Sequence, residues 1–212
     1  MKTILLQGDS ITDSGRSRDC DLYPGWGYST MLSGRIGLKY PGKFRMLNRG
    51  VGADRIVDIY ARIKTDIINL KPDFLSILIG VNDAGHDMGE WPNGVSPEKF
   101  KLIYGLLIEE IRAALPDIKI YILEPFTLKG SCNEGNYEAF RHQVALRGAA
   151  ARETAEKYGL PFVPLQEHFD ALSALCDNTQ WLMDGIHPTP AGYAMITDKL
   201  FAAMEKDLEA AL

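Results

Sequence analysis

The chain has 212 residues, of which 46% are hydrophobic and 24% are charged, proportions typical of a soluble globular protein. Its 23 Lys and Arg against 28 Asp and Glu give a formal net charge of −5. This acidic balance argues against nucleic acid as a partner, because nucleic-acid binding depends on neutralising phosphates. It also offers no polybasic segment for anionic lipid, and no apolar run approaches the roughly 20 residues of a spanning helix, so we expect no membrane partner.

The cysteines are odd in number and scattered along the chain: Cys20, Cys132 and Cys176. They have no CxxC or CxxH spacing, which indicates free thiols rather than a disulfide framework or a structural zinc site. The first apolar run ends at Gln7 and is too short for a secretory signal, so we expect a cytoplasmic protein. No repeat, low-complexity run or linker interrupts the chain, which predicts one domain over residues 1–212.

Short apolar runs predict five buried strands, in chain order at residues 4–7, 44–47, 74–79, 118–123 and, more weakly, 162–165. Longer segments with helical composition or spacing lie between them, at residues 56–70, 100–115 and 137–158. A last helix begins at Thr189 and Pro190, which suit the N-cap and first helical positions. This alternation predicts right-handed βαβ crossovers, and therefore a three-layer α/β fold with a central, mostly parallel sheet of about five strands.

Polar residues follow the predicted strands at the edge where such sheets bind ligands. Ser10 follows the first strand, the glycine-rich stretch 49–54 follows the second, and Asn82 follows the third. Asp184 and His187 stand just before the last helix. A serine, a histidine, an aspartate and an amide donor are the parts of a serine hydrolase, so we expect these loops to converge.

Each part also has a simpler interpretation. Ser10 suits a helix cap, and Asn82 suits an ordinary turn. Asp184 lies three residues before His187 and can orient its imidazole so that Nε2 takes the serine proton, but the two also suit a surface pair at a helix entrance. The stretch 49–54 can supply a backbone N–H donor. It lacks the glycine spacing of either common nucleotide-binding loop, which disfavours a nucleotide ligand.

Taken together and in this order, four segments resemble the sequence blocks of the SGNH hydrolases, also called the GDSL esterase family: Gly8-Asp9-Ser10, residues 48–54, Gly80-Val81-Asn82-Asp83 and Asp184–Pro188. The resemblance covers nearly the whole chain and implies the flavodoxin-like SGNH hydrolase fold. It implies that Ser10 is the nucleophile, that His187 is the base and that Asp184 is its partner.

The resemblance also implies an oxyanion hole. Its donors would be the Ser10 N–H, the Asn82 side chain and one backbone N–H of the second block. That N–H belongs to Ala53 at the position where relatives usually have glycine, and Gly52 is the alternative donor. A backbone donor needs no particular side chain, but it needs a backbone angle that alanine can adopt.

Within the family, residues 10–16 resemble intracellular acetylxylan esterases and related sugar deacetylases. This implies a serine esterase that removes acetyl groups from a small-molecule or oligosaccharide ester, without a metal or a cofactor. Asp9 and Trp91 are candidate substrate-binding residues, because an aromatic ring in a polar loop can stack on a sugar. Trp91 could equally pack in the hydrophobic interior beneath its loop. The same two interpretations, sugar stacking and interior packing, apply to Trp26 and Trp181.

The sequence is also compatible with other functions. A lysophospholipase or thioesterase would need an apolar groove for its acyl chain, and a non-catalytic carbohydrate-binding module would have no use for a serine beside a base. A metal-dependent phosphohydrolase is disfavoured, because Ile11 stands where an Asp-x-Asp motif would place its second aspartate; it would use Asp9, Asp13, Asp83, Asp184 and His187. The oligomeric state is also open, and exposed aromatic residues in the C-terminal half are the candidates for a homo-oligomer interface.

Overall fold

The computed structural model describes residues 1–89 and 92–212. Its five strands form one sheet in the order β2-β1-β3-β4-β5, and every neighbouring pair is parallel. The strands are β1 (Lys2–Gly8), β2 (Phe44–Asn48), β3 (Phe74–Leu78), β4 (Lys119–Leu123) and β5 (Phe162–Val163). This confirms the predicted α/β fold with a parallel sheet, and the strand order is that of flavodoxin-like proteins.

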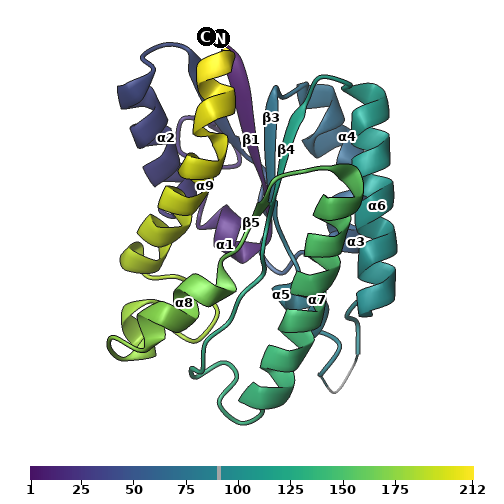
Figure 1. Ribbon diagram of the computed structural model, residues 1–212, viewed down its shortest axis with the longest axis vertical. Helices are drawn as coiled ribbons and strands as arrows, with labels where there is room; N and C mark the ends of the chain where they lie inside the picture. The colour runs from purple at the N-terminus through teal and green to yellow at the C-terminus, as the bar shows by residue number, and fades with distance from the viewer. Residues whose placement is uncertain (90–91) are drawn as a thin grey trace.

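Helices cover both faces of the sheet (Figure 1). One face packs against α2 (Tyr28–Lys39), α8 (Gln166–Ser173) and α9 (Pro190–Ala210). The other packs against α3 (Ile56–Ala61), α4 (Ile63–Asp66), α6 (Pro97–Ala114) and much of α7 (Tyr137–Tyr158). Because both faces are covered, all residues of β3 are buried, which explains why the sequence of this strand is almost entirely apolar.

Two short helices lie at the carboxyl end of the sheet. Helix α1 (Ser10–Asp13) follows β1 directly, and α5 (Val81–Gly85) begins close behind β3. In Figure 1 both lie below the strands, at the ends of the strands that point away from the two chain termini. A further short helix, η2 (Asn178–Gln180), lies in the connection from α8 to α9. The loops that carry the candidate residues after β1, β2 and β3 therefore share one edge of the sheet.

The single helix predicted over residues 56–70 is wrong in detail, because this segment forms three pieces: α3, α4 and η1 (Ile68–Leu70). The backbone leaves the helical conformation at Arg62 (φ −106°, ψ 12°) and at Ile67 (φ −130°, ψ −68°). The isoleucine stripe nevertheless remains buried: Ile56, Ile59, Ile63 and Ile67. The spacing of apolar residues predicts which side of the segment faces the core. It does not distinguish one continuous helix from several short helices that keep the same side buried.

Helix α2 has no counterpart in the sequence prediction. It contains Gly34 and Gly37, which are weak helix formers, so its local sequence gives little signal. It is held by packing, because Tyr28, Leu32 and Ile36 recur every fourth residue and are buried against the sheet. None of the described helices is both long and apolar enough to cross a membrane.

Candidate active site

Ser10 is the first residue of α1 and follows β1 through a tight turn. A Cβ on Gly8 would lie 2.3 Å from the carbonyl oxygen of Leu78, so the turn has no room for a side chain there. Asp9 is the N-cap of α1, and its Oδ1 accepts a hydrogen bond from the Ile11 N–H at 3.0 Å. The N–H of Ser10 has no hydrogen-bond partner among the described residues. The turn therefore leaves both the hydroxyl and the backbone N–H of Ser10 available to a ligand.

Ser10, His187 and Asp184 lie in one hydrogen-bonded row. The Ser10 Oγ is 3.0 Å from the His187 Nε2, although the two residues are 177 positions apart in the sequence. The His187 Nδ1 is 2.7 Å from the Asp184 Oδ2. A carboxylate at Nδ1 favours the tautomer whose Nε2 is free to accept the serine proton. This is the spatial arrangement that the sequence blocks predict.

The carboxylate of Asp184 is fixed by its own turn. Its Oδ1 accepts hydrogen bonds from the backbone N–H groups of Ile186 at 2.9 Å and His187 at 2.8 Å. Partial burial alone raises the pKa of Asp184, but hydrogen bonds from the His187 N–H, the His187 imidazole and the Ile186 N–H together outweigh it and lower the pKa to about 2. Asp184 is therefore ionised at every pH at which an esterase is normally assayed.

The loop after β4 supports the Asp184 turn from behind. Gly185 has a φ of +97°, and a Cβ on it would lie 2.6 Å from the Leu128 carbonyl oxygen, so only glycine fits. The Cys132 N–H donates to the Asp184 carbonyl oxygen at 3.0 Å, and the Cys132 Sγ lies 3.3 Å from the Asp184 Oδ2. Partial burial and this contact with the carboxylate raise the pKa of the Cys132 thiol, which keeps it protonated as a donor. Cys132 is not predictable as part of the site, because no local motif connects it to a turn 52 residues away.

Asn82 lies in the first turn of α5. Its Nδ2 donates to the Asp54 carbonyl oxygen at 3.1 Å, which joins the loop after β3 to the loop after β2 and leaves one N–H of the amide for a ligand. The start of α5 is anchored by Arg147, a fully buried residue of α7. The Arg147 guanidinium donates to the carbonyl oxygens of Asp83 at 3.3 Å and Val95 at 3.1 Å.

The structure distinguishes the two candidate backbone donors, Ala53 and Gly52. Gly52 lies against Ser10, since a Cβ on it would be 3.9 Å from the Ser10 Cβ. Its N–H already donates to the Asp13 Oδ2 at 3.1 Å, whereas the Ala53 N–H is unpaired within residues 1–89 and 92–212. Ala53 has a φ of +65°, a left-handed conformation that costs a non-glycine residue about 1 kcal/mol. The hydrogen-bond pattern favours Ala53 as the donor, at a strained position of the kind that clusters at functional sites.

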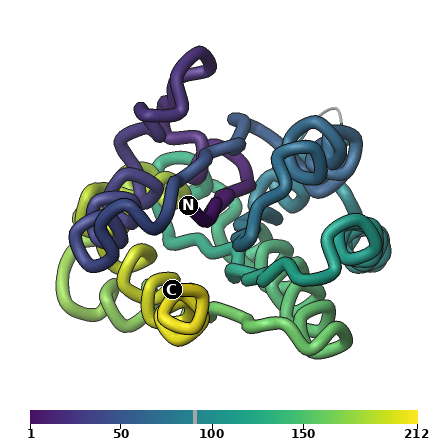
Figure 2. The backbone as a smooth tube through the Cα atoms, turned by 90° about the horizontal axis from the view of Figure 1, so that it is seen from above, coloured from purple at the N-terminus to yellow at the C-terminus, as the bar shows by residue number. Residues whose placement is uncertain are grey.

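A cavity of about 510 Å³ opens beside Ser10 and His187. Trp26, Met183 and Arg16 also line it. The indole of Trp26 is 58% exposed and packs edge-on against Tyr193, with 5.6 Å between ring centroids. It belongs to the segment between α1 and α2, which extends from the body of the molecule (Figure 2).

The positions of the other aromatic residues correct one expectation, that exposed aromatic residues lie in the C-terminal half. Trp91, the predicted stacking residue, lies outside the described residues. Trp181 is partly buried and packs against the core. Among the described residues, the large exposed aromatic side chains are Tyr23 and Trp26, in the N-terminal half and not in the C-terminal half. Trp26 is thus the described aromatic residue that faces the candidate nucleophile.

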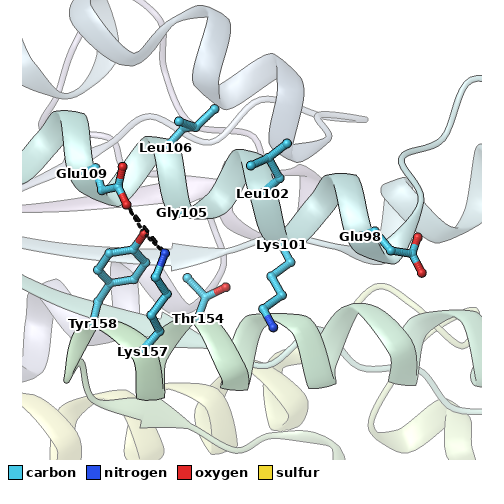
Figure 3. Close-up of a pocket in the computed structure, with 9 residues that line it drawn as sticks. All are labelled: Glu98, Lys101, Leu102, Gly105, Leu106, Glu109, Thr154, Lys157 and Tyr158. Carbon is cyan, nitrogen blue, oxygen red and sulfur yellow. Dashed lines mark hydrogen bonds and ion pairs between the residues drawn. The ribbon is translucent and has the colours of Figure 1, made fainter.

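A second cavity, of about 320 Å³, lies between α6 and α7 (Figure 3). Glu109, Tyr158 and Lys157 interact at one end of it. Thr154 donates its hydroxyl to the Ala150 carbonyl within its own helix. No serine, cysteine or histidine of the described residues lines this cavity, so it does not compete with the one beside Ser10. In the described part of the chain, no three His, Cys, Asp or Glu residues form a group that could hold a metal.

Known proteins resemble this chain over almost its whole length. The sequence profile of the GDSL-like lipase/acylhydrolase family matches residues 6–195. The chain belongs to this family. An acetylxylan esterase from Geobacillus stearothermophilus is 29% identical over 208 residues, which cover 91% of this chain and 89% of that protein. This GDSL-type chain is accordingly a carboxylic ester hydrolase, as the sequence blocks predict.

Solved structures of related proteins agree with the fold. A GDSL-like lipase candidate from Parabacteroides merdae superposes with a TM-score of 0.89 at 30% identity, covering 96% of this chain and 95% of that one. An acetylxylan esterase from Geobacillus stearothermophilus superposes with a TM-score of 0.84 at 26% identity, covering 96% and 94%. The five-stranded parallel sheet flanked by helices is thus the architecture of the SGNH hydrolases.

Asp9 does not contact the cavity, and the prediction that it binds substrate is wrong. Its side chain is 1% exposed, because its carboxylate points inward to cap α1. Burial raises the pKa of Asp9 to about 7, and the charge of Asp83 adds to this effect. Asp83 is itself fully buried and accepts from the Ile56 N–H at 3.0 Å, and burial raises its pKa to about 7 as well. Adjacent residues in a motif can face opposite ways, which the residue types alone do not reveal.

These two buried carboxyls make stability depend on pH. Their folded pKa values lie above the ordinary value of 3.8, so their stabilising contribution is complete below about pH 4 and is lost as the pH rises through about 7. We expect the free energy of unfolding to be greater at about pH 5.5 than at about pH 8, by on the order of 4 kcal/mol, roughly 2 kcal/mol from each carboxyl. Urea unfolding at both pH values measures the difference. Asp83→Asn should reduce it, because an amide does not ionise; an unchanged difference in this variant would argue against a titrating Asp83.

Asn82→Ala is expected to lower kcat for p-nitrophenyl acetate by roughly 10²–10³, with little change in KM, because the amide donor acts on charge that develops in the transition state. Steady-state kinetics measure both constants, and thermal unfolding checks that the variant is folded. Asn136→Ala is a matched control, since Asn136 begins α7 without a side-chain capping hydrogen bond. A kcat for Asn82→Ala that equals that of the control would exclude Asn82 from the oxyanion hole.

Proposed function

We propose that this esterase removes acetyl groups from a carbohydrate and that Ser10, His187 and Asp184 carry out the reaction. The main observation is the hydrogen-bonded row of these three side chains beside a cavity that contains an exposed tryptophan. An indole face offers a large apolar surface for a sugar ring. The similarity to an acetylxylan esterase supports an acetyl ester of a sugar as the substrate.

The first half of the reaction forms an acetyl-enzyme. The Ser10 Oγ attacks the acetyl carbonyl carbon while the His187 Nε2 takes the hydroxyl proton, and the Asp184 carboxylate stabilises the resulting imidazolium. The oxyanion accepts hydrogen bonds from the Ser10 and Ala53 N–H groups and from the Asn82 amide. When the tetrahedral intermediate collapses, its bond to the sugar oxygen breaks, and His187 gives the proton to that oxygen.

The second half returns the enzyme to its starting state. A water molecule attacks the acetyl-Ser10 carbonyl carbon while the His187 Nε2 takes one of its protons. The same donors hold the second oxyanion. The bond to the Ser10 Oγ then breaks, His187 returns the proton to that oxygen, and acetic acid leaves and ionises in water.

Acetate release from acetylated xylooligosaccharides tests the proposed substrate. We expect release from these sugars and faster hydrolysis of acetyl than of octanoyl p-nitrophenyl esters. A preference for octanoyl esters without release from sugars would favour the lysophospholipase or thioesterase alternative. Tight binding of the sugars without any release would favour a carbohydrate-binding module.

Trp26→Ala tests the role of the exposed indole in sugar binding. We expect kcat/KM for the acetylated sugar to fall roughly fivefold relative to that for ethyl acetate, because a stacking contact is worth about 1 kcal/mol and ethyl acetate has no ring. Trp26→Phe should retain part of the preference. An equal fall for both esters would assign Trp26 to the folding of its loop rather than to the sugar.

A further inference from the structure

Arg16 places a positive charge in the wall of the Ser10 cavity. Its Nε donates to the Gly50 carbonyl oxygen at 2.8 Å, and its Nη1 lies 3.5 Å from the Ser17 carbonyl oxygen. Its Nη2 has no hydrogen-bond partner, and no carboxylate forms an ion pair with Arg16 in the described part of the chain. A guanidinium is charged at any ordinary pH. Arg16 therefore offers N–H donors and a charge that the protein itself does not use.

The neighbouring arginines differ from Arg16, because each has a counter-ion. The Arg18 guanidinium makes a two-pronged contact with the Asp13 carboxylate, whose Oδ1 lies 3.1 Å from the Arg18 Nη1. The Arg49 Nη1 is 2.7 Å from the Asp21 Oδ1. The lining of the cavity contains Asp13, Arg16 and Arg18 as its charged members and has one excess positive charge, although the whole chain is at −5.

Two arginines, Arg18 and Arg49, lie close enough to Arg16 to repel its charge. Burial is the main reason that the pKa of Arg16 falls below its usual range; the charges of Arg18 and Arg49 lower it further, and those of Asp13 and Asp66 act in the opposite direction. Asp13, the carboxylate with the largest effect on Arg16, is already paired with the Arg18 guanidinium. An anion placed beside Arg16 would relieve the local repulsion between positive charges.

We propose that Arg16 binds a carboxylate on the sugar, so that the preferred substrate is an acetyl ester of an acidic sugar such as a uronic acid. This inference rests on the proposed deacetylase function and specifies its substrate class. The planar guanidinium fits a carboxylate through two parallel hydrogen bonds, which distinguishes a carboxylate from a neutral sugar substituent. Trp26 and Ser10 line the same cavity, so one ligand can meet the indole, the guanidinium and the nucleophile together.

The guanidinium is held in place before any ligand binds. The hydrogen bond from its Nε to the Gly50 carbonyl fixes one edge of the group, and the half-buried stem limits its rotamers. A donor that is already ordered loses less conformational entropy on binding than a free surface arginine does. Arg16 thus combines an unsatisfied charge with a fixed position at the active site.

A pair of matched sugars tests this inference: acetylated glucuronic acid and acetylated glucuronamide with the acetyl group on the same carbon. We expect the wild type to have a kcat/KM roughly tenfold higher for the acid, because a charge-assisted hydrogen bond at a partly exposed site is worth about 1.4 kcal/mol. Added salt should reduce this preference. Arg16→Gln should bring the ratio of acid to amide to about one, through a higher KM for the acid, and Arg16→Lys should retain part of the preference.

Arg35→Gln is the control for a general loss of positive charge. Arg35 belongs to α2, pairs with Asp198 of α9 and does not line the cavity, so this variant should keep the wild-type ratio. The role of Arg16 is overturned if the wild type has an acid-to-amide ratio of kcat/KM near one, or if Arg16→Gln keeps the wild-type ratio. Deacetylation of both sugars would still support the proposed function in either case.

The carbohydrate function can also fail while the role of Arg16 as an anion-binding residue stands. If neither these sugars nor the acetylated xylooligosaccharides are deacetylated, the carbohydrate function fails, and para-acetoxybenzoate and para-acetoxybenzamide then report on Arg16 alone. A preference for the benzoate that is lost in Arg16→Gln supports an anion subsite on a different ester. Equal rates for the two aromatic esters overturn it.

Discussion

Ser10→Ala is expected to lower kcat for p-nitrophenyl acetate by on the order of 10⁵, because the variant lacks the hydroxyl that would form the acetyl-enzyme. The remaining rate would come from the oxyanion donors and from binding. Ser14 also lines the cavity, but its hydroxyl is oriented within its own loop: it lies 3.3 Å from the Thr12 carbonyl oxygen and accepts from the Gly27 N–H at 3.1 Å. It is therefore not positioned to replace Ser10.

Steady-state kinetics and covalent labelling check this expectation together. A serine-directed fluorophosphonate should label the wild-type chain at Ser10 and leave Ser10→Ala unlabelled. Ser14→Ala should retain kcat to within about tenfold, since it loses only hydrogen bonds within a loop. Near-native turnover by Ser10→Ala, or a label found on Ser14, would contradict the assignment of the nucleophile.

Asp184→Asn is expected to lower kcat by roughly 10³–10⁴ without unfolding the protein. The two backbone N–H groups at Oδ1 can be satisfied only by the amide oxygen, so the amide nitrogen must face the His187 Nδ1. An N–H donor at that position forces the imidazole to carry its proton on Nε2. The Nε2 that faces the Ser10 Oγ at 3.0 Å could then no longer accept the serine proton.

Steady-state kinetics on acetyl esters measure the loss, and thermal unfolding confirms that the variant is folded. Asp177→Asn is a matched control, because Asp177 is an aspartate of the same connection that only caps η2. Since the pKa of Asp184 is lowered to about 2, we expect no further fall in rate from its protonation above about pH 3. A loss below tenfold in Asp184→Asn would mean that the aspartate does not set the tautomer of His187.

Local sequence was informative wherever a short segment determines its own geometry. Asp184 and His187 lie three residues apart, and the turn between them satisfies the carboxylate with its own N–H groups, so their pairing is predictable from spacing. Likewise, Thr189 caps α9, and Gly159 ends α7 with a left-handed φ of 60°, as their residue types indicate. Such contacts involve few residues, and the identity of each residue limits the conformations available to it.

Contacts between distant segments were less predictable. The direction of Asp9, the break within residues 56–70 and the presence of Cys132 behind Asp184 depend on which surfaces pack together. The same is true of Trp26 and Arg16, which meet Ser10 in one cavity only because the segment between α1 and α2 folds back beside it. Neither residue belongs to a spacing pattern that indicates a ligand.

The sequence by itself determined the parallel α/β architecture, because apolar periodicity and turn residues act locally. It also determined the family, through four sequence blocks that follow predicted strands or precede the last helix. Only the tertiary structure decided which side chains line the cavity and that, among the described residues, the N–H of Ala53 rather than that of Gly52 is free. A hydrogen bond between remote loops, or an unpaired charge beside a nucleophile, depends on the relative position of several elements. That position follows from packing over the whole sheet, which no single segment encodes.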